Sequence, residues 1–123
     1  MTVLITGDMS FSYDVNGLSS TYLSPRFKII VMCNGGGGIF RFIKPTSDLP
    51  ELETCFEIHR DISVEKYADL FGLRYFELND EKSAAEVLSL FFAEEDRPAI
   101  LAVHTPNVYN AEVLRGYFRR SRQ

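Results

Sequence analysis

The feature that most constrains this chain is a set of short runs in which consecutive, rather than alternate, residues are apolar. Three of these runs, Thr2–Ile5, Phe27–Cys33 and Ala99–Val103, have the length of a strand, and Arg74–Leu78 is a fourth strand-like segment. Continuous apolar runs are typical of strands in parallel sheets, because helices cover both faces of such sheets. None of the runs approaches the roughly 20 residues that a membrane-spanning helix requires, so we expect no membrane span.

Segments with helical periodicity lie between these runs. We expect helices over Ser10–Ser20, over Val64–Phe71, from residue 79 or 80 to about residue 94, and from Asn110 towards the C-terminus. The last helix has an apolar stripe that we expect to be buried: Val113, Leu114, Tyr117 and Phe118. Strands that alternate with helices build right-handed crossovers. The sequence therefore predicts an α/β fold, a doubly wound parallel sheet flanked by helices.

Composition limits the class of protein further. The chain has 123 residues, of which 46% are hydrophobic, enough for the core of one globular domain. Thirteen basic and seventeen acidic residues give a net charge of −4, so we expect no broad cationic face and no nucleic-acid partner. Cys33 and Cys55 are too few for a disulfide scaffold, and no signal peptide precedes them, so a cytoplasmic setting is expected.

The stretch Pro45–Arg60 lacks a clear period, contains two prolines and is rich in acidic residues. We expect a long loop there, with about one turn of helix. Loops of this length in compact domains often cover functional sites.

Two loops follow strands at their carboxyl ends, which is the edge of a parallel sheet where ligands bind. They are Gly7–Ser10, which leads into a helix, and Cys33–Phe40, which contains four glycines. If the two strands are neighbours, Asp8 and Asn34 converge, and their oxygens together with glycine carbonyls suit Mg²⁺. The N–H groups at the start of the helix favour an anion. Together the loops predict a site for a metal-bridged diphosphate, although each alone is equally compatible with a plain turn or linker.

The strings GDMSFSYDVNGL, from Gly7, and NGGGGIFRFIKP, from Asn34, resemble a family motif. In thiamine-diphosphate-dependent enzymes a Gly-Asp pair and an asparagine hold Mg²⁺ and the cofactor diphosphate. The strings are most similar to one branch, the 2-succinyl-5-enolpyruvyl-6-hydroxy-3-cyclohexene-1-carboxylate synthases of menaquinone biosynthesis. Met9 departs from the general motif, which has a second glycine there, and Cys33 stands where a first asparagine is common. Beyond residue 60 the likeness is mainly one of architecture.

This resemblance implies a role for individual residues. The Mg²⁺ ligands would be Asp8, Asn34 and Gly36. The cofactor-binding set would be Gly7, Asp8, Met9, Ser10, Asn34, Gly36, Gly37, Ile39 and Phe40. The wall facing the substrate would consist of Ile39, Phe40 and Ile43.

The resemblance also implies an activity. Members of this branch are transferases that decarboxylate 2-oxoglutarate on thiamine diphosphate and add the succinyl unit to isochorismate. The glutamate that activates the cofactor comes from a separate N-terminal domain, usually of a partner subunit, so no residue of this chain is expected to be catalytic. We therefore expect residues 1–123 to be a C-terminal cofactor-binding fragment that is inactive alone. Its partners would be the remaining domains of the same enzyme, in a homodimer or homotetramer, and small-molecule substrates.

Two alternatives remain open. One is another thiamine-diphosphate 2-oxo-acid decarboxylase or an acetolactate-synthase-like carboligase. The other is a non-catalytic flavodoxin-like binding domain that needs neither Mg²⁺ nor thiamine. The Ile39-Phe40 pair and the Tyr13–Asn16 helix favour the synthase branch.

Several charged residues have a structural as well as a functional interpretation. Arg41 and Lys44 would meet substrate carboxylates or lie on a solvated face, and we expect the solvated face. His104, at the end of a strand, is expected to be hydrogen-bonded there and not to belong to the site. Arg115 lies in a basic cluster that we expect to cap the last helix, and His59 has no identified partner.

Overall fold

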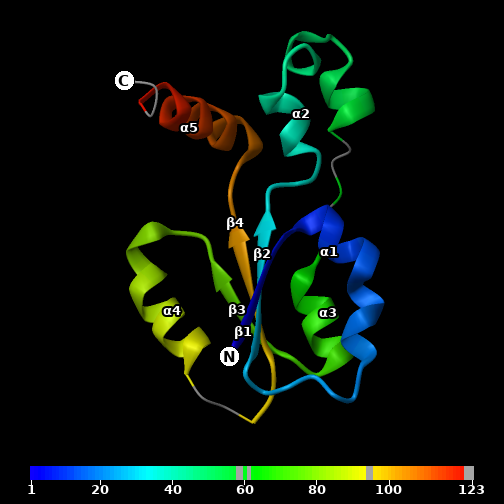
Figure 1. Cartoon of the computed structure of the whole chain (residues 1–123), viewed down its shortest axis with the longest axis vertical. Coiled ribbons are helices and arrows are strands. Elements are labelled where there is room, and N and C mark those ends of the chain that lie inside the picture. The colour runs from blue at the N-terminus through cyan, green and yellow to red at the C-terminus, as the bar shows by residue number, and fades with distance from the viewer. Residues whose placement is uncertain (58–59, 61, 94–95, 121–123) are drawn as a thin grey trace. The chain divides into compact units, whose positions relative to one another are not determined.

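A computed structural model describes residues 1–57, 60, 62–93 and 96–120 of the chain. The chain forms two compact units. The sheet unit comprises Met1–Cys33 and Ile62–His104, and the loop unit comprises Asn34–Asp61 and Thr105–Gln123. Figure 1 shows the path of the chain through both units.

Four parallel strands form the sheet of the sheet unit. They are β1 (Thr2–Gly7), β2 (Phe27–Cys33), β3 (Arg74–Leu78) and β4 (Ala99–His104). Their order is β1-β2-β4-β3, and every neighbouring pair is parallel (Figure 1). The predicted strands are therefore confirmed, with β1 and β4 slightly longer than predicted, and so is the α/β class.

Helices connect these strands. The helix predicted over Val64–Phe71 is α3, with the same bounds. The Ser63 hydroxyl caps it by accepting a hydrogen bond from the Lys66 amide, and Gly72 ends it in the left-handed conformation. The other helical segments of this unit are α1 (Asp8–Asp14), the 3-10 helices η1 (Val15–Ser19) and η4 (Glu81–Ser83), and α4 (Ala84–Phe92).

Two of the predicted helices have different bounds in the structure. The helix predicted over Ser10–Ser20 begins earlier, at Asp8, and its second half is a 3-10 helix. In the helix predicted from residue 79 or 80, α-helical structure begins only at Ala84, because the Asp80 side chain caps a 3-10 turn before it. The predicted end near Glu94 lies outside the described residues.

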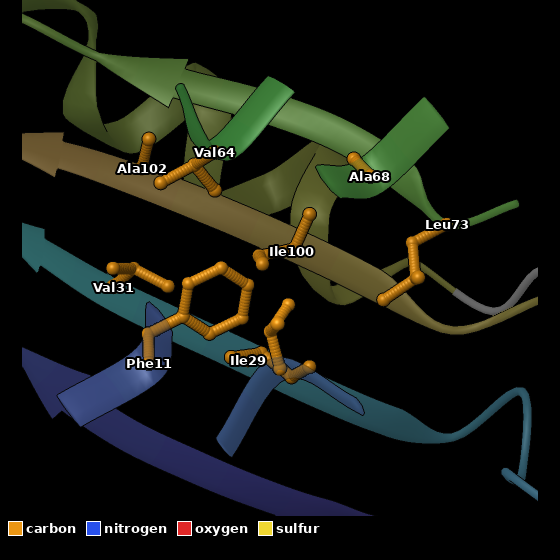
Figure 2. Packing of buried hydrophobic residues seen from close by; sticks show 9 residues of the cluster. Phe11, Ile29, Val31, Val64, Ala68, Leu73, Ile100 and Ala102 are labelled. Atoms are coloured by element: carbon orange, nitrogen blue, oxygen red, sulfur yellow. The ribbon is translucent and has the colours of Figure 1, made fainter. Parts of the chain in front are cut away.

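Apolar side chains cover both faces of the sheet. On one face, α1, η1 and α3 pack on alternate residues of β2 and β4, among them Ile29, Val31 and Ile100 (Figure 2). On the other face, Phe91 of α4 packs against Leu101 and its neighbours. The sheet unit is therefore a three-layered α/β/α arrangement, as the continuous apolar runs predicted.

The strand β1 departs from this prediction. Val3, Leu4 and Ile5 are exposed, the last by 67%. β1 is the edge strand of the sheet, and within the described part of the chain it pairs only with β2. A continuous apolar run thus identified a strand correctly, but the expectation that both its faces are covered was wrong for this chain.

The loop unit contains short helical turns where mostly loop was predicted. The helix α2 (Gly38–Phe42) follows the glycine run. The stretch Pro45–Arg60 contains the 3-10 turn η2 (Thr46–Asp48) and the π-helical turn η3 (Leu52–Phe56). The prediction of about one helical turn therefore understated how much of this segment is ordered by backbone hydrogen bonds.

The last helix, α5, spans Asn107–Arg120. It begins earlier than predicted, because the Asn110 amide already donates to the Pro106 carbonyl (3.0 Å). Its buried residues are Asn107 and Ala111. The predicted buried stripe is instead exposed: Val113, Leu114, Tyr117 and Phe118. Helical periodicity identifies the residues that share a face, but it does not show what covers that face.

The structure also bears on the expected absence of a membrane span. Within the ranges that the structure describes, no helix has both the length and the apolar character needed to cross a bilayer.

Candidate functional site

The candidate site begins at the carboxyl ends of β1 and β2. These strands are hydrogen-bonded parallel neighbours, and Gly7 pairs in register with Met32. Asp8 directly follows β1, and Asn34 directly follows β2. The expectation that the two strands are neighbours is therefore confirmed, and both loops leave the sheet at the same edge.

Asp8 is a buried acidic residue at the first position of α1. Its Oδ1 accepts a hydrogen bond from the Met9 amide (2.8 Å). Burial of Cys33, and secondarily the negative charge of Asp8, raise the pKa of the Cys33 thiol to about 11. Cys33 is therefore a protonated, weakly reactive thiol at neutral pH, and it forms no disulfide.

The glycine run adopts a defined backbone conformation. Gly35, Gly36 and Gly37 have φ angles of 84°, 87° and 62°, in a region that residues with a Cβ rarely adopt. The Gly36 amide donates to Oδ1 of Asn34 (3.1 Å), so the asparagine side chain closes the first turn of the loop. Glycine is thus required here by backbone geometry, independently of any ligand.

Close packing adds a second requirement for glycine. A Cβ on Gly37 would lie 2.6 Å from Cα of Glu57 and 2.7 Å from the Phe56 carbonyl oxygen. A Cβ on Gly38 would lie 2.5 Å from Oδ1 of Asn107. At Gly37 the neighbouring atoms belong to the backbone and leave no room for a side chain, whereas a Cβ on Gly38 would require the Asn107 side chain to move. The loop therefore fits closely against its neighbours in the loop unit.

Asn107 is a residue that the sequence analysis missed. It is buried at the start of α5, and its Nδ2 donates to the Gly36 carbonyl (2.8 Å). Its Oδ1 is buried and has no hydrogen-bond partner among the described residues. The asparagine directly after Pro106 indicates the start of a helix, and this was the one signal that the sequence offered. Its contact with Gly36 joins segments that are far apart in the sequence, and no local pattern predicts such a contact.

The donor set has the chemistry of a site for a hard cation. The predicted ligands supply a carboxylate from Asp8, an amide oxygen from Asn34 and a carbonyl oxygen from Gly36. Mg²⁺ binds such oxygens and few protein ligands in total. Across the described part of the chain, no group of three histidine, cysteine or acidic residues could hold a metal ion. One carboxylate oxygen together with amide and carbonyl oxygens is a ligand set that suits Mg²⁺ better than zinc.

The predicted substrate-wall residues lie on and just after α2. Ile39, Phe40 and Ile43 are all exposed apolar side chains. The Phe40 ring packs on Phe56, with ring centroids 5.4 Å apart, and Ile39 borders a cavity of about 440 Å³ in the loop unit. Their exposure is compatible with contact to a ligand, but their role stays a prediction.

Arg41 does not lie on a solvated face, contrary to our expectation. Its guanidinium donates to both carboxylate oxygens of the buried Glu57 and to Glu53. These hydrogen bonds, that of Glu57 first, raise the pKa of Arg41 above its ordinary range. Lys44, in contrast, is well exposed beside Asp48, as expected.

Arg115 also differs from its predicted role in capping α5. Its Nη2 donates to the Arg41 carbonyl (2.6 Å), so it joins α5 to α2 within the loop unit. His104 is paired as expected for a histidine at a strand end, with its Nε2 2.9 Å from Oε1 of Glu77. His59 lies outside the described residues.

Comparison with known proteins gives a consistent set of relatives, although no family model matches the chain. The chain is 49% identical over 117 residues to a 2-succinyl-5-enolpyruvyl-6-hydroxy-3-cyclohexene-1-carboxylate synthase from Porphyromonas gingivalis. It is 40% and 36% identical to the synthases of the same name from Flavobacterium johnsoniae and Christiangramia forsetii. These matches cover 94–95% of this chain and 20–21% of each relative. The chain thus spans about a fifth of the length of these relatives, and along nearly all of its own length it belongs to the 2-succinyl-5-enolpyruvyl-6-hydroxy-3-cyclohexene-1-carboxylate synthase family.

Proposed function

We propose that this chain is the diphosphate- and Mg²⁺-anchoring domain of a thiamine-diphosphate-dependent synthase of menaquinone biosynthesis. The synthase as a whole would decarboxylate 2-oxoglutarate and add the succinyl unit to isochorismate. The observation that carries the proposal is the register of β1 and β2, from whose carboxyl ends Asp8 and the glycine loop, Asn34–Gly38, both leave the sheet. Membership of the synthase family supports the same assignment.

The proposed Mg²⁺ ligands are the side chains of Asp8 and Asn34 and the carbonyl of Gly36. The carboxylate supplies the negative charge, and the two neutral oxygens complete the protein's share of a hard-cation site. Asn107 orients the Gly36 carbonyl through its hydrogen bond, in the way that outer-shell groups orient metal ligands.

The backbone of the glycine loop is the second part of the proposed site. Because Gly36 and Gly37 have no side chain, a diphosphate can approach their backbone closely. The remaining proposed cofactor contacts are Gly7, Met9 and Ser10 before and in α1. When bound, thiamine diphosphate would supply the electron sink for decarboxylation, and the protein would anchor and orient it.

Ile39, Phe40 and Ile43 are the proposed wall towards the substrate. Exposed apolar side chains directly after a phosphate-binding loop can exclude water from a reacting centre once a ligand covers them. Their exposed position on and after α2 supports this role.

The remaining parts of the proposed enzyme lie outside this chain. Since the chain corresponds to about a fifth of its relatives, we propose that it acts as a C-terminal part together with the other domains of the synthase. The assembled enzyme would be a cytoplasmic homodimer or homotetramer.

Calorimetric titration of the 123-residue chain tests the anchoring role. We expect thiamine diphosphate to bind only with Mg²⁺, inorganic pyrophosphate with Mg²⁺ to compete for the site, and thiamine without phosphates not to bind. Asp8→Asn keeps the shape of the side chain but removes its charge. It should weaken binding by at least about a hundredfold, because even outer-shell partners of a metal contribute about 10–100-fold.

Asp14→Asn is the matched control, because Asp14 is an exposed acid in the same helix. The affinity of Asp14→Asn for thiamine diphosphate with Mg²⁺ should stay within about twofold of that of the unmodified chain, because exposed charges usually contribute little. Equal binding of thiamine and thiamine diphosphate would contradict the proposal. Binding of a flavin mononucleotide without Mg²⁺ would favour the flavodoxin-like alternative.

A further inference from the structure

The loop unit contains an acidic residue, Glu57, that is fully buried. It directly follows the turn η3, and its amide donates to the Leu52 carbonyl (2.8 Å). Both of its carboxylate oxygens accept hydrogen bonds from Arg41 of α2, at 2.8 Å from Nε and 2.5 Å from Nη2. This two-point contact fixes the orientation of both side chains, because the guanidinium and the carboxylate are planar and fit in one arrangement.

The backbone of Glu57 also contacts the glycine loop. The close approach described above, at 2.6 Å from a Cβ on Gly37, is to the Cα of this same residue. Glu57 therefore touches the loop through its backbone, and through Arg41 it holds the helix into which the loop continues.

Two side chains of α5 also hold this segment. Asn107 donates to the Gly36 carbonyl, and Arg115 donates to the Arg41 carbonyl. Side chains from α5 thus hold the glycine loop at Gly36 and α2 at Arg41. Glu57 contacts the same two elements, the loop at Gly37 and the helix at Arg41.

A buried ion pair is an inefficient means of stabilising a fold, since apolar residues of similar volume often do as well or better. What such a pair supplies is a single geometry. We propose that Glu57 is a positioning residue that, through Arg41, holds the glycine loop in the shape that receives the diphosphate. The identity of the ligand in this inference rests on the proposed function, whereas the ordering of the loop by Glu57 does not.

Amide hydrogen exchange in the 123-residue chain tests the positioning directly. Glu57→Gln keeps the volume of the side chain and removes its charge. The reporters are the amides of Gly36 and Phe40, which donate to Asn34 and to the Gly37 carbonyl within the loop. Their exchange should accelerate at least about tenfold, whereas the core amides of β4 should not change, because local opening precedes global unfolding.

Glu53→Gln provides a matched control. Glu53 binds the same guanidinium at 2.9 Å, but its side chain is 67% exposed, so its loss should change loop exchange by less than about twofold. Titration with Mg²⁺ and inorganic pyrophosphate is the second readout. Affinity should fall at least about tenfold in Glu57→Gln and hardly at all in Glu53→Gln, in proportion to the opening of the loop.

The two readouts separate the possible failures. If the unmodified chain does not bind Mg²⁺ and pyrophosphate, the proposed function fails, while exchange still decides whether Glu57 orders the loop. Unchanged loop exchange in Glu57→Gln overturns the positioning role. Should Glu57→Gln not fold, Arg41→Lys takes its place, because lysine keeps the charge but not the two-point contact; unchanged exchange in Arg41→Lys overturns the role equally.

Discussion

At the scale of single residues, Gly37 is the position at which the surrounding structure most strongly restricts the type of residue. Its φ of 62° lies in the left-handed region, and the backbone of Phe56 and Glu57 occupies the space of a side chain. Either condition alone disfavours other residues. Together they make this position depend on glycine for folding as well as for any ligand.

Gly37→Ala should therefore lower the free energy of unfolding by about 2–4 kcal/mol, from backbone strain of about 1–3 kcal/mol and the added clash. Urea denaturation of the 123-residue chain measures this change. Gly17→Ala is the control, since nothing lies within 4 Å of a Cβ there, and its effect should stay near about 0.5 kcal/mol. Equal stability of the two variants would show that the loop can relax around a Cβ.

The residue scale also shows what sequence reasoning can and cannot find in a site. Asp8 and Asn34 were predicted because strand ends and glycine runs are local patterns. Glu57 and Asn107 were not, because their importance depends on contacts with the glycine loop across long stretches of chain. Arg41 was assigned to a solvated face for the same reason, since its partner Glu57 lies in a segment without a readable period.

At the scale of elements, the exposed apolar face of β1 has a physical consequence. An edge strand offers unpaired backbone N–H and C=O groups, and exposed apolar side chains on it favour pairing with another chain. Ile5 is the most exposed apolar residue of this strand, at 67%.

The isolated chain should therefore self-associate through β1, and Ile5→Lys should reduce this association, because charges on an edge strand oppose pairing. Analytical ultracentrifugation over a range of protein concentrations measures it. Leu70→Lys is the control, since Leu70 is 72% exposed but lies on the helix α3. The same loss of association in both variants would mean that general surface polarity, and not the strand edge, governs it.

The elements also show why the positions of strands and helices were easier to predict than which of their apolar faces are buried. The bounds of β2, β3 and α3 were predicted correctly, because apolar runs, capping residues and glycine stops are local signals. The stripe of α5 was placed wrongly in the core, since an apolar stripe has the same pattern whether this chain or another segment covers it.

At the scale of the whole molecule, the chain corresponds to about a fifth of its relatives. The site we propose anchors one end of a cofactor and contains no residue to which catalysis is assigned. Under this proposal, binding and turnover would be separable properties of the assembled enzyme.

The chain alone should bind Mg²⁺ and thiamine diphosphate without turning over 2-oxoglutarate and isochorismate. Addition of the remaining domains of the synthase should restore turnover, because catalytic groups act only when held in the correct geometry. Release of carbon dioxide measures the reaction. Turnover by the chain alone, at a rate similar to that of the assembled enzyme, would refute the division of roles.

The close packing at Gly37 restricts which mutations of its codon the protein can tolerate. Every amino-acid replacement that a single base change can make in a glycine codon introduces a Cβ, and at Gly37 a Cβ has no space. The codon for Gly37 can therefore change only through silent substitutions, unless the residues around the glycine loop move too. A scan for reactive side chains would overlook it, yet a saturation-mutagenesis map should show it among the least tolerant stretches of the protein.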